Sequence, residues 1–428
     1  MAAVFAVLMR GCAPRCMDDR VAMKRYLLHV LLFIGLLAGL AATVQAQEPI
    51  TIERSDAGYT FQKEVRFSLQ ASGNITITQA TLHFRLADQP ASNLADAAIT
   101  PHRSIKAEYA WRLVDEELPS GTVVTYWWTV EDAAGNKIDS ERRSFTYEDT
   151  RFTWKKLSRD DVTLAWYRGD DAFGRDLLDA ATSAAQRLMQ EFSVERKPAA
   201  IYVYGNYNDL RSGIGESAQE WTGGRAYPEF GVVLIGVPTN QLAFGRRAVA
   251  HEFAHLIVHR ATSNPFGDLP RWLDEGLAMW TEGDLDSTYK AALNRAVRSN
   301  RLLSLQTLAS NFPADAQQAT LAYAESYSAV VYIRDQFGAQ KVGDLLTTFK
   351  EGTTDDTALQ KVLGLTTDEL DARWRASLGV GADSSSQEPD LTDSFAPRRM
   401  LLVIGMGLLA GAAVVFVALV AVVIRIRA

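Results

Sequence analysis

The 428-residue sequence is poor in cysteine, and both of its cysteines, Cys12 and Cys16, lie within the first 46 residues. The remainder of the chain can therefore form no internal disulfide, and it offers no thiolate to a metal ion. Any metal site in that part must use imidazole and carboxylate ligands. Long apolar runs are also scarce, with one near each end of the chain.

Residues 47–397 lack a basic excess as well. They hold 35 Lys and Arg against 49 Asp and Glu, a formal charge of −14. A surface this acidic argues against nucleic acid as a partner, because phosphate recognition needs clustered cations. The whole chain is 47% hydrophobic and 22% charged, which is ordinary for a folded protein, and its length leaves room for two or three domains.

The first apolar run is typical of a secretory signal peptide, which we place at residues 1–46. A basic pair precedes apolar residues 27–42, and Ala46 supplies the small residue expected at a cleavage site. Met17 or Met23 could be the true start of the chain. An uncleaved signal anchor is the alternative, although the apolar run is short for a membrane span.

The second apolar run predicts one transmembrane helix with a short cytoplasmic tail at residues 398–428. Residues 400–424 carry no charged side chain, and they exceed the ~20 residues that cross a bilayer. Arginines flank the run on both sides, so the signal peptide decides the orientation. We expect a single-pass protein of the cell membrane whose folded domains are extracytoplasmic. Residues 380–397 are polar and acidic and predict a disordered linker.

Residues 47–150 predict an all-β domain. Apolar and polar residues alternate in short runs, as from 124 to 130, and a period of two is the pattern of strands with one buried face. Such a domain suggests a β-sandwich similar to immunoglobulin or fibronectin type III modules. Trp111, Trp127 and Trp128 could form a sugar-binding platform, but aromatic residues at strand spacing more often belong to a core. A protein or glycan partner for this domain is therefore open.

Residues 246–278 hold the candidate chemistry. His251, Glu252 and His255 form an HExxH motif on a predicted helix, so both imidazoles lie on one face and can bind one metal ion. Zinc accepts imidazole and carboxylate ligands, and a catalytic zinc site leaves one position to water. Glu275 would be the third ligand. Glu252 adjoins the first histidine, where it can accept a proton from that water.

The motif and the later segment WLDEGLA resemble the gluzincin zinc metallopeptidases, which include thermolysin and the membrane alanyl aminopeptidases. The closest likeness is to the bacterial peptidase MA-like domain, over residues 162–378. The resemblance implies that His251, His255 and Glu275 bind Zn²⁺ and that Glu252 is the general base. It also implies that residues 151–379 form an α+β thermolysin-like domain with a helical C-terminal lobe, as the periodicity favours.

Several gluzincins place an aspartate one turn after the glutamate ligand to brace a histidine, whereas this chain has Met279. Asp274 or Asp284 could take that role. Zinc peptidases of this group commonly use a tyrosine or histidine of the later lobe to donate to the tetrahedral oxyanion. Tyr323 and Tyr327 are the candidates, although helical tyrosines more often serve packing.

Two features beside the motif have simpler readings. His259 lies near the face of His251, and we interpret it as a helix-end residue and not as a ligand. In gluzincin-like proteases an edge strand of the sheet pairs with extended substrate, and the resemblance implies that this strand is the one predicted at residues 231–237 or one close by; the alternative for residues 231–237 is an ordinary central strand.

These observations favour a membrane-anchored extracytoplasmic zinc metallopeptidase that acts on peptides or proteins. The sequence has no GxMEN-like stretch of the kind that reads a free amine, which slightly favours an endopeptidase. The alternative is a non-catalytic cell-surface binding or scaffold protein in which the metallopeptidase fold is structural. The separate β domain suits that alternative, while the presence of all four motif residues favours the enzyme.

Overall fold

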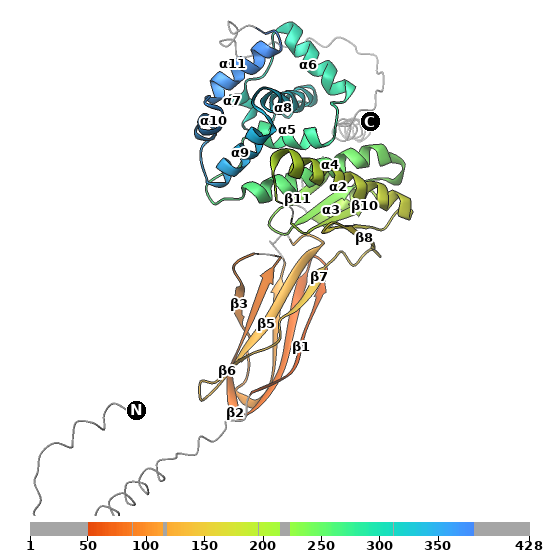
Figure 1. Ribbon diagram of the computed structural model, residues 1–428. Coiled ribbons are helices and arrows are strands. Elements are labelled where there is room, and N and C mark those ends of the chain that lie inside the picture. Colours follow the sequence, from red (N-terminus) through yellow and green to blue (C-terminus); the bar gives the residue numbers. More distant parts are fainter. Residues whose placement is uncertain are drawn as a thin grey trace, which may run out of the picture.

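The computed structural model describes residues 50–380, except for residues 88, 114–117, 196, 215–222 and 311. The predicted signal peptide and transmembrane helix, and nearly all of the predicted linker, lie outside the described residues. Within the described part, no helix combines the length and the apolar character needed to cross a membrane. An N-terminal β-rich region is followed by a largely helical one (Figure 1), which confirms the coarse multidomain layout.

The β-rich region is built around one long strand, β2 (Glu64–Leu86). The first half of β2 pairs with β1 and β4, its second half pairs with β3 and β5, and the register shifts between Ser72 and Ile77. Phe67 in the first half lies 5.6 Å from the ring of Phe84 in the second, so the two halves face each other as layers. The other strands are β1 (Thr51–Thr60), β3 (Asn93–Asp96), β4 (His102–Arg112), β5 (Thr122–Asp132), β6 (Lys137–Asp139) and β7 (Arg143–Tyr147).

The core of this region takes two of the three tryptophans that could have formed a sugar-binding platform. Trp111 and Trp128 are buried among the apolar residues between the layers. Trp127 points to the other face of β5, where its ring stacks on His83 at 4.9 Å and the guanidinium of Arg142 lies 4.6 Å from its centroid. The three tryptophans therefore do not form one platform.

A second sheet of five strands follows in the order β11-β12-β10-β9-β8. Three central strands run parallel and two antiparallel strands form the edges. The central strands are continuously apolar because both faces are covered, one by α2 and α4, the other by α3 and aromatic residues. These elements are β8 (Lys155–Arg159), β9 (Val162–Trp166), β10 (Ala199–Tyr204), β11 (Gly224–Tyr227), β12 (Val232–Gly236), α2 (Asp171–Phe192), α3 (Tyr207–Ile214) and α4 (Leu242–Thr262).

The strand predicted at residues 231–237 is thus a central strand, β12, and the sheet edge beside it is β11. The edge strand escaped the sequence patterns because it has only four residues and begins at the second glycine of a pair. Both alternatives for the predicted strand had been open, and sheet order decides between them.

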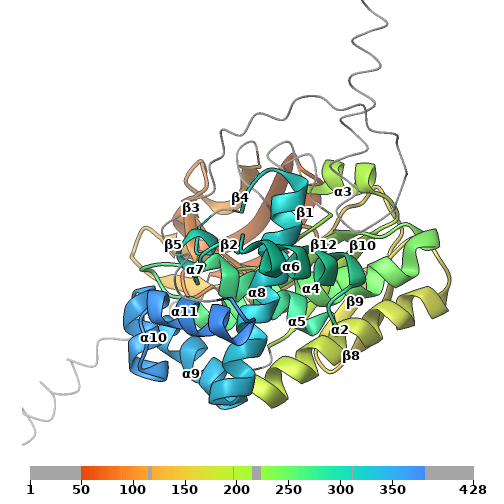
Figure 2. The same ribbon diagram turned by 90° about the horizontal axis from the view of Figure 1, so that it is seen from above.

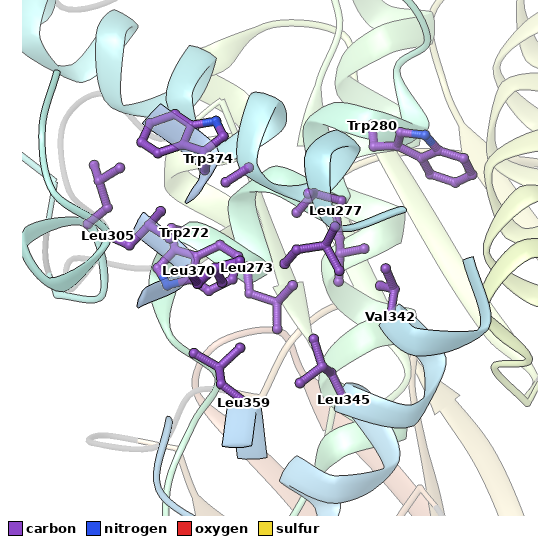
Figure 3. Packing of buried hydrophobic residues seen from close by; sticks show 14 of the residues in the cluster. Trp272, Leu273, Leu277, Trp280, Leu305, Val342, Leu345, Leu359, Leu370 and Trp374 are labelled. Atoms are coloured by element: carbon purple, nitrogen blue, oxygen red, sulfur yellow. The ribbon is translucent and has the colours of Figure 1, made fainter. Parts of the chain in front are cut away.

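The remaining chain is helical, as predicted. Helix α4 packs against α2 and α5, and α8 packs on α5, so these four helices follow one another in Figure 1, while Figure 2 shows α9, α10 and α11 grouped at one edge. The helices are α5 (Arg271–Thr281), α6 (Ser287–Ser299), α7 (Leu305–Leu308), α8 (Ala316–Phe337), α9 (Ala339–Lys350), α10 (Asp355–Leu363) and α11 (Thr367–Ser377). Figure 3 shows how Trp272, Leu273 and Leu277 of α5 lie among apolar side chains of the later helices.

The two regions meet through buried polar contacts on the sheet face opposite α4. Asp149 is fully buried, and its carboxylate accepts hydrogen bonds from Arg151 at 2.5 Å and from Tyr204 Oη of β10 at 3.2 Å. Tyr202, also on β10, donates to Glu148. These donors therefore leave the buried charge of Asp149 paired at the junction.

Candidate metal centre

Helix α4 has one apolar side that packs in the core and one side that carries the two histidines. Val249, Phe253 and Leu256 are buried and pack towards the sheet and α2. His251 and His255 lie on the opposite side, towards α5, because residues four apart share a helix face. The apolar side therefore fixes the helix, while the two imidazoles are presented to a neighbouring element.

The neighbouring element is helix α5, and a glycine of α5 lets it pack closely against α8. A Cβ added at Gly276 would lie 2.4 Å from the backbone oxygen of Ser326 on α8, so only glycine fits at this crossing. The close packing of α5 on α8 directs the preceding residue, Glu275, towards α4. The side chain of Glu275 is only 6% exposed.

The three predicted ligands come together as a candidate metal-binding cluster. His251 Nε2 and His255 Nε2 are 3.1 Å apart, and each lies 3.4 Å from Oε2 of Glu275. Donor atoms around a tetrahedral zinc ion are separated by roughly 3.3 Å, as follows from zinc–ligand distances near 2.05 Å. Oε2 of Glu275 is buried and makes no hydrogen bond. The donor triangle and this orphaned oxygen both fit a zinc ion.

Carboxylates brace both histidines from behind. Glu282 Oε1 lies 2.8 Å from His251 Nδ1, and Asp274 Oδ1 lies 3.0 Å from His255 Nδ1. Each carboxylate can accept the Nδ1 proton, which leaves the Nε2 atom of the same ring able to bind a metal ion. His259 joins this network, since its Nε2 lies 2.9 Å from Asp274 Oδ2.

The sequence left open which carboxylates contact the two histidines, and the structure identifies them. Asp274, one of the two proposed candidates, contacts His255, whereas the exposed Asp284 makes no hydrogen bond to either ligand histidine. Met279, at the position of the missing aspartate, is buried beside Leu285. Glu282 was missed; it lies seven residues, or two helical turns, beyond Glu275, and that spacing is the signal that could have found it.

Glu252 lies beside the cluster and beneath the sheet edge. It is partly buried, and burial raises the pKa of its carboxyl group. A Cβ added at Gly224 of β11 would lie 2.7 Å from Cγ of Glu252, so the edge strand passes directly against this side chain. Glu252 and His251 line a cavity of about 150 Å³.

Only one of the two candidate tyrosines lines this cavity. Tyr323 lines it, and the Tyr323 ring lies 6.3 Å from that of His251. Burial raises the pKa of Tyr323, so its hydroxyl group keeps the proton it would donate. Tyr327, one turn later, packs with Met279 and Leu285 and is not among the residues that line the cavity. Tyr289 also lines the cavity and was not anticipated.

The charges of the cluster are strongly coupled. Burial acts to lower the pKa of His251, but the neighbouring carboxylates of Glu275 and Glu282 outweigh it and raise that pKa to about 9. Burial acts to raise the pKa of Glu275, but the two histidines lower it to about 2. Without an ion, the cluster therefore keeps its carboxylates ionised and balances them with protonated imidazole. A bound cation would displace protons from the Nε2 atoms.

Comparison with known proteins gives one informative match. Residues 180–380 match the family model of the Peptidase MA superfamily. The match supports a peptidase MA-like domain here. That domain contains α4, α5 and every residue of the candidate metal centre. No curated protein matches the chain.

Some solved structures show partial likeness. The Br derivative of BhCBM56 has 14% identity and a TM-score of 0.16, covering 22% of this chain and 88% of its own. OgpA from Akkermansia muciniphila has 8% identity and a TM-score of 0.20, covering 24% and 28%. A carbohydrate-binding module family 56 β-1,3-glucan-binding domain has 9% identity and a TM-score of 0.16, covering 23% and 98%. Scores this low establish no common fold.

Proposed function

We propose that the peptidase MA-like domain is a zinc metallopeptidase of the gluzincin type that hydrolyses peptide bonds. The donor triangle of His251, His255 and Glu275 carries the proposal, because its 3.1 and 3.4 Å edges match a tetrahedral zinc site with one position left over. When bound, Zn²⁺ supplies a Lewis acid that polarises the scissile carbonyl and acidifies a water molecule.

The residues around the ligands provide the other parts of a hydrolysis. Glu252, whose pKa burial raises, accepts a proton from water and returns it to the leaving amine. Tyr323 keeps its hydroxyl proton and donates to the developing oxyanion across the cavity. Both residues act inside a partly enclosed cavity, where electrostatic effects are stronger than in bulk water.

The edge strand β11 supports a peptide substrate. A strand at a sheet edge has backbone groups that can pair with an extended chain, and β11 runs beside Glu252 at Gly224. A substrate added to this edge would cross the cavity with its backbone close to the general base. Pairing through the backbone does not require a free terminus, and we therefore propose an endopeptidase.

The substitution Glu252→Gln tests the mechanism, because it keeps the side-chain shape and removes the base. We expect the full-length variant to bind zinc as the wild type does and to lose cleavage of a mixed peptide library by at least about a hundredfold. Glu229→Gln, at an exposed turn between β11 and β12, is the matched control and should keep full activity. A zinc-loaded Glu252→Gln variant with wild-type turnover would show that Glu252 is not the base.

The same assay decides the alternative of a non-catalytic scaffold. Chelator-sensitive cleavage by the wild type supports the enzyme. If the zinc-loaded wild type cleaves nothing across a broad library, the binding or scaffold role is favoured, and a protein or glycan partner of the β-rich region becomes the next question.

We also propose, from the sequence of the two termini, that the enzyme is anchored to the cell membrane by residues 398–428 with its folded regions extracytoplasmic. Membrane fractionation followed by protease digestion of intact cells tests this placement. Recovery of the chain in the soluble fraction would contradict the anchor, and protection of the folded regions would contradict the orientation.

A further inference from the structure

The two carboxylate oxygens of the ligand Glu275 have different surroundings. Oε2 faces the imidazoles and lies 3.4 Å from each Nε2 atom. Oε1 accepts a hydrogen bond of 3.1 Å from Nη2 of Arg271, which lies one turn earlier on α5. The metal-facing side and the Arg271-facing side of this carboxylate are therefore separated within a buried side chain.

Arg271 is itself held in place. Its guanidinium lies 5.3 Å from the ring centroid of Phe312, a cation–π contact, and its backbone N–H donates to the carbonyl oxygen of Ala309 at 3.1 Å. The Phe312 ring meets Tyr323 edge to face at 5.2 Å. Arg271 is thus fixed between the ligand and a ring that contacts the tyrosine at the cavity.

The pair is more than a helix-surface ion pair. An exposed pair four residues apart contributes little, because solvent screens it. Here the side chain of Arg271 is 42% exposed while that of Glu275 is 6% exposed, so the carboxylate is taken out of water and depends on its partners. Loss of Arg271 would leave Oε1 buried with no donor.

We propose that Arg271 is a positioning residue that holds Glu275 as a ligand through one oxygen only. A carboxylate freed on both oxygens can bind a metal through both, and the second oxygen would take the position that water needs. By holding Oε1, the guanidinium keeps that position open and fixes the direction of Oε2. The inference rests on the proposed function only in requiring a metal ion at the three ligands.

Cobalt substitution of the full-length protein tests the proposal, because the visible bands of Co²⁺ weaken as the coordination number rises from four to five. We expect Arg271→Gln to show weaker, five-coordinate bands at saturating cobalt. Arg271→Lys, which retains a cation, should keep most of the wild-type spectrum. Arg246→Gln, an exposed arginine of α4 that pairs with Asp176, is the matched control and should leave the spectrum unchanged.

Zinc affinity, measured by competition with a chromophoric chelator, is the second measurement. We expect Arg271→Gln to bind zinc about tenfold more weakly than the wild type, as is typical when a partner of a metal ligand is lost. An unchanged cobalt spectrum in Arg271→Gln would overturn the proposal, whether or not affinity falls. Should Arg271→Gln fail to fold by circular dichroism, a wild-type spectrum in Arg271→Lys supports the proposal, and five-coordinate bands there overturn it.

The inference and the proposed function fail separately. A wild-type protein that binds cobalt in four-coordinate geometry but cleaves no peptide would contradict the peptidase and leave the role of Arg271 testable. An active peptidase whose cobalt spectrum is unchanged in Arg271→Gln would contradict only the positioning role.

Discussion

Glu282 is expected to control zinc affinity through His251, and the substitution Glu282→Gln isolates its charge. Its Oε1 lies 2.8 Å from His251 Nδ1, and the two side chains are 17% and 15% exposed. A hydrogen bond to a charged group contributes about 1.5–3 kcal/mol, and one between neutral groups about 0.5–1.5 kcal/mol. Glutamine keeps an acceptor at this position and loses the charge. The difference is about 1–1.5 kcal/mol, or about tenfold in zinc affinity.

Asp284→Asn is the control for this prediction. It removes the same charge two residues away from an exposed side chain that makes no hydrogen bond to either ligand histidine. Zinc competition against a chromophoric chelator at constant pH and ionic strength measures both variants. We expect Glu282→Gln to weaken binding about tenfold and Asp284→Asn less than twofold. Equal losses of zinc affinity in the two variants would mean that only the total negative charge near the site matters. The proposed role of the hydrogen bond from His251 to Glu282 would then be refuted.

Two further predictions concern pH and packing. The pKa of His251 is raised to about 9 in the folded protein, against about 6.5 in the unfolded chain, so protonated His251 stabilises the metal-free protein fully below pH 6.5. The thermal midpoint of the metal-free protein should therefore fall as pH rises from 6.5 to 9. Zinc should stabilise the protein more at pH 8 than at pH 6, because it competes with protons for the imidazole. A pH-independent midpoint of the metal-free protein would contradict this. Gly276→Ala should cost about 1–3 kcal/mol in unfolding free energy and weaken zinc binding, because its Cβ meets the α8 backbone. Denaturant unfolding compares it with Gly267→Ala, where nothing lies within 4 Å; equal stability of the two variants would contradict the packing argument.

The sequence was sufficient where the information was local. Period-two alternation predicted the β-rich region, and the helical pattern predicted the later lobe. The placement of His251 and His255 on one face follows from their spacing of four. The choice of Glu275 as a ligand needed the resemblance carried by WLDEGLA, since nineteen residues separate it from His255 and no periodicity links the two helices.

The pair Tyr323 and Tyr327 shows where local reasoning stops. Both lie on α8 four residues apart, so the sequence treats them alike, yet only Tyr323 lines the cavity. The edge strand shows the same limit, because strand order in a sheet depends on pairing between segments that are distant in the chain. Neither β11 nor the interior position of β12 could be assigned from alternation alone.

By itself, the sequence determined the two candidate histidine ligands and the candidate base Glu252, because residue type and helix spacing are local properties, whereas Glu275 needed the resemblance. The tertiary structure decided what surrounds them: Glu282 and Asp274 behind the histidines, Arg271 behind Glu275, and Gly224 against Glu252. Those contacts join residues on separate elements. They exist because α5 packs closely between α4 and α8, and the approach of helices to one another is set by the packing of whole side chains rather than by any single run of residues.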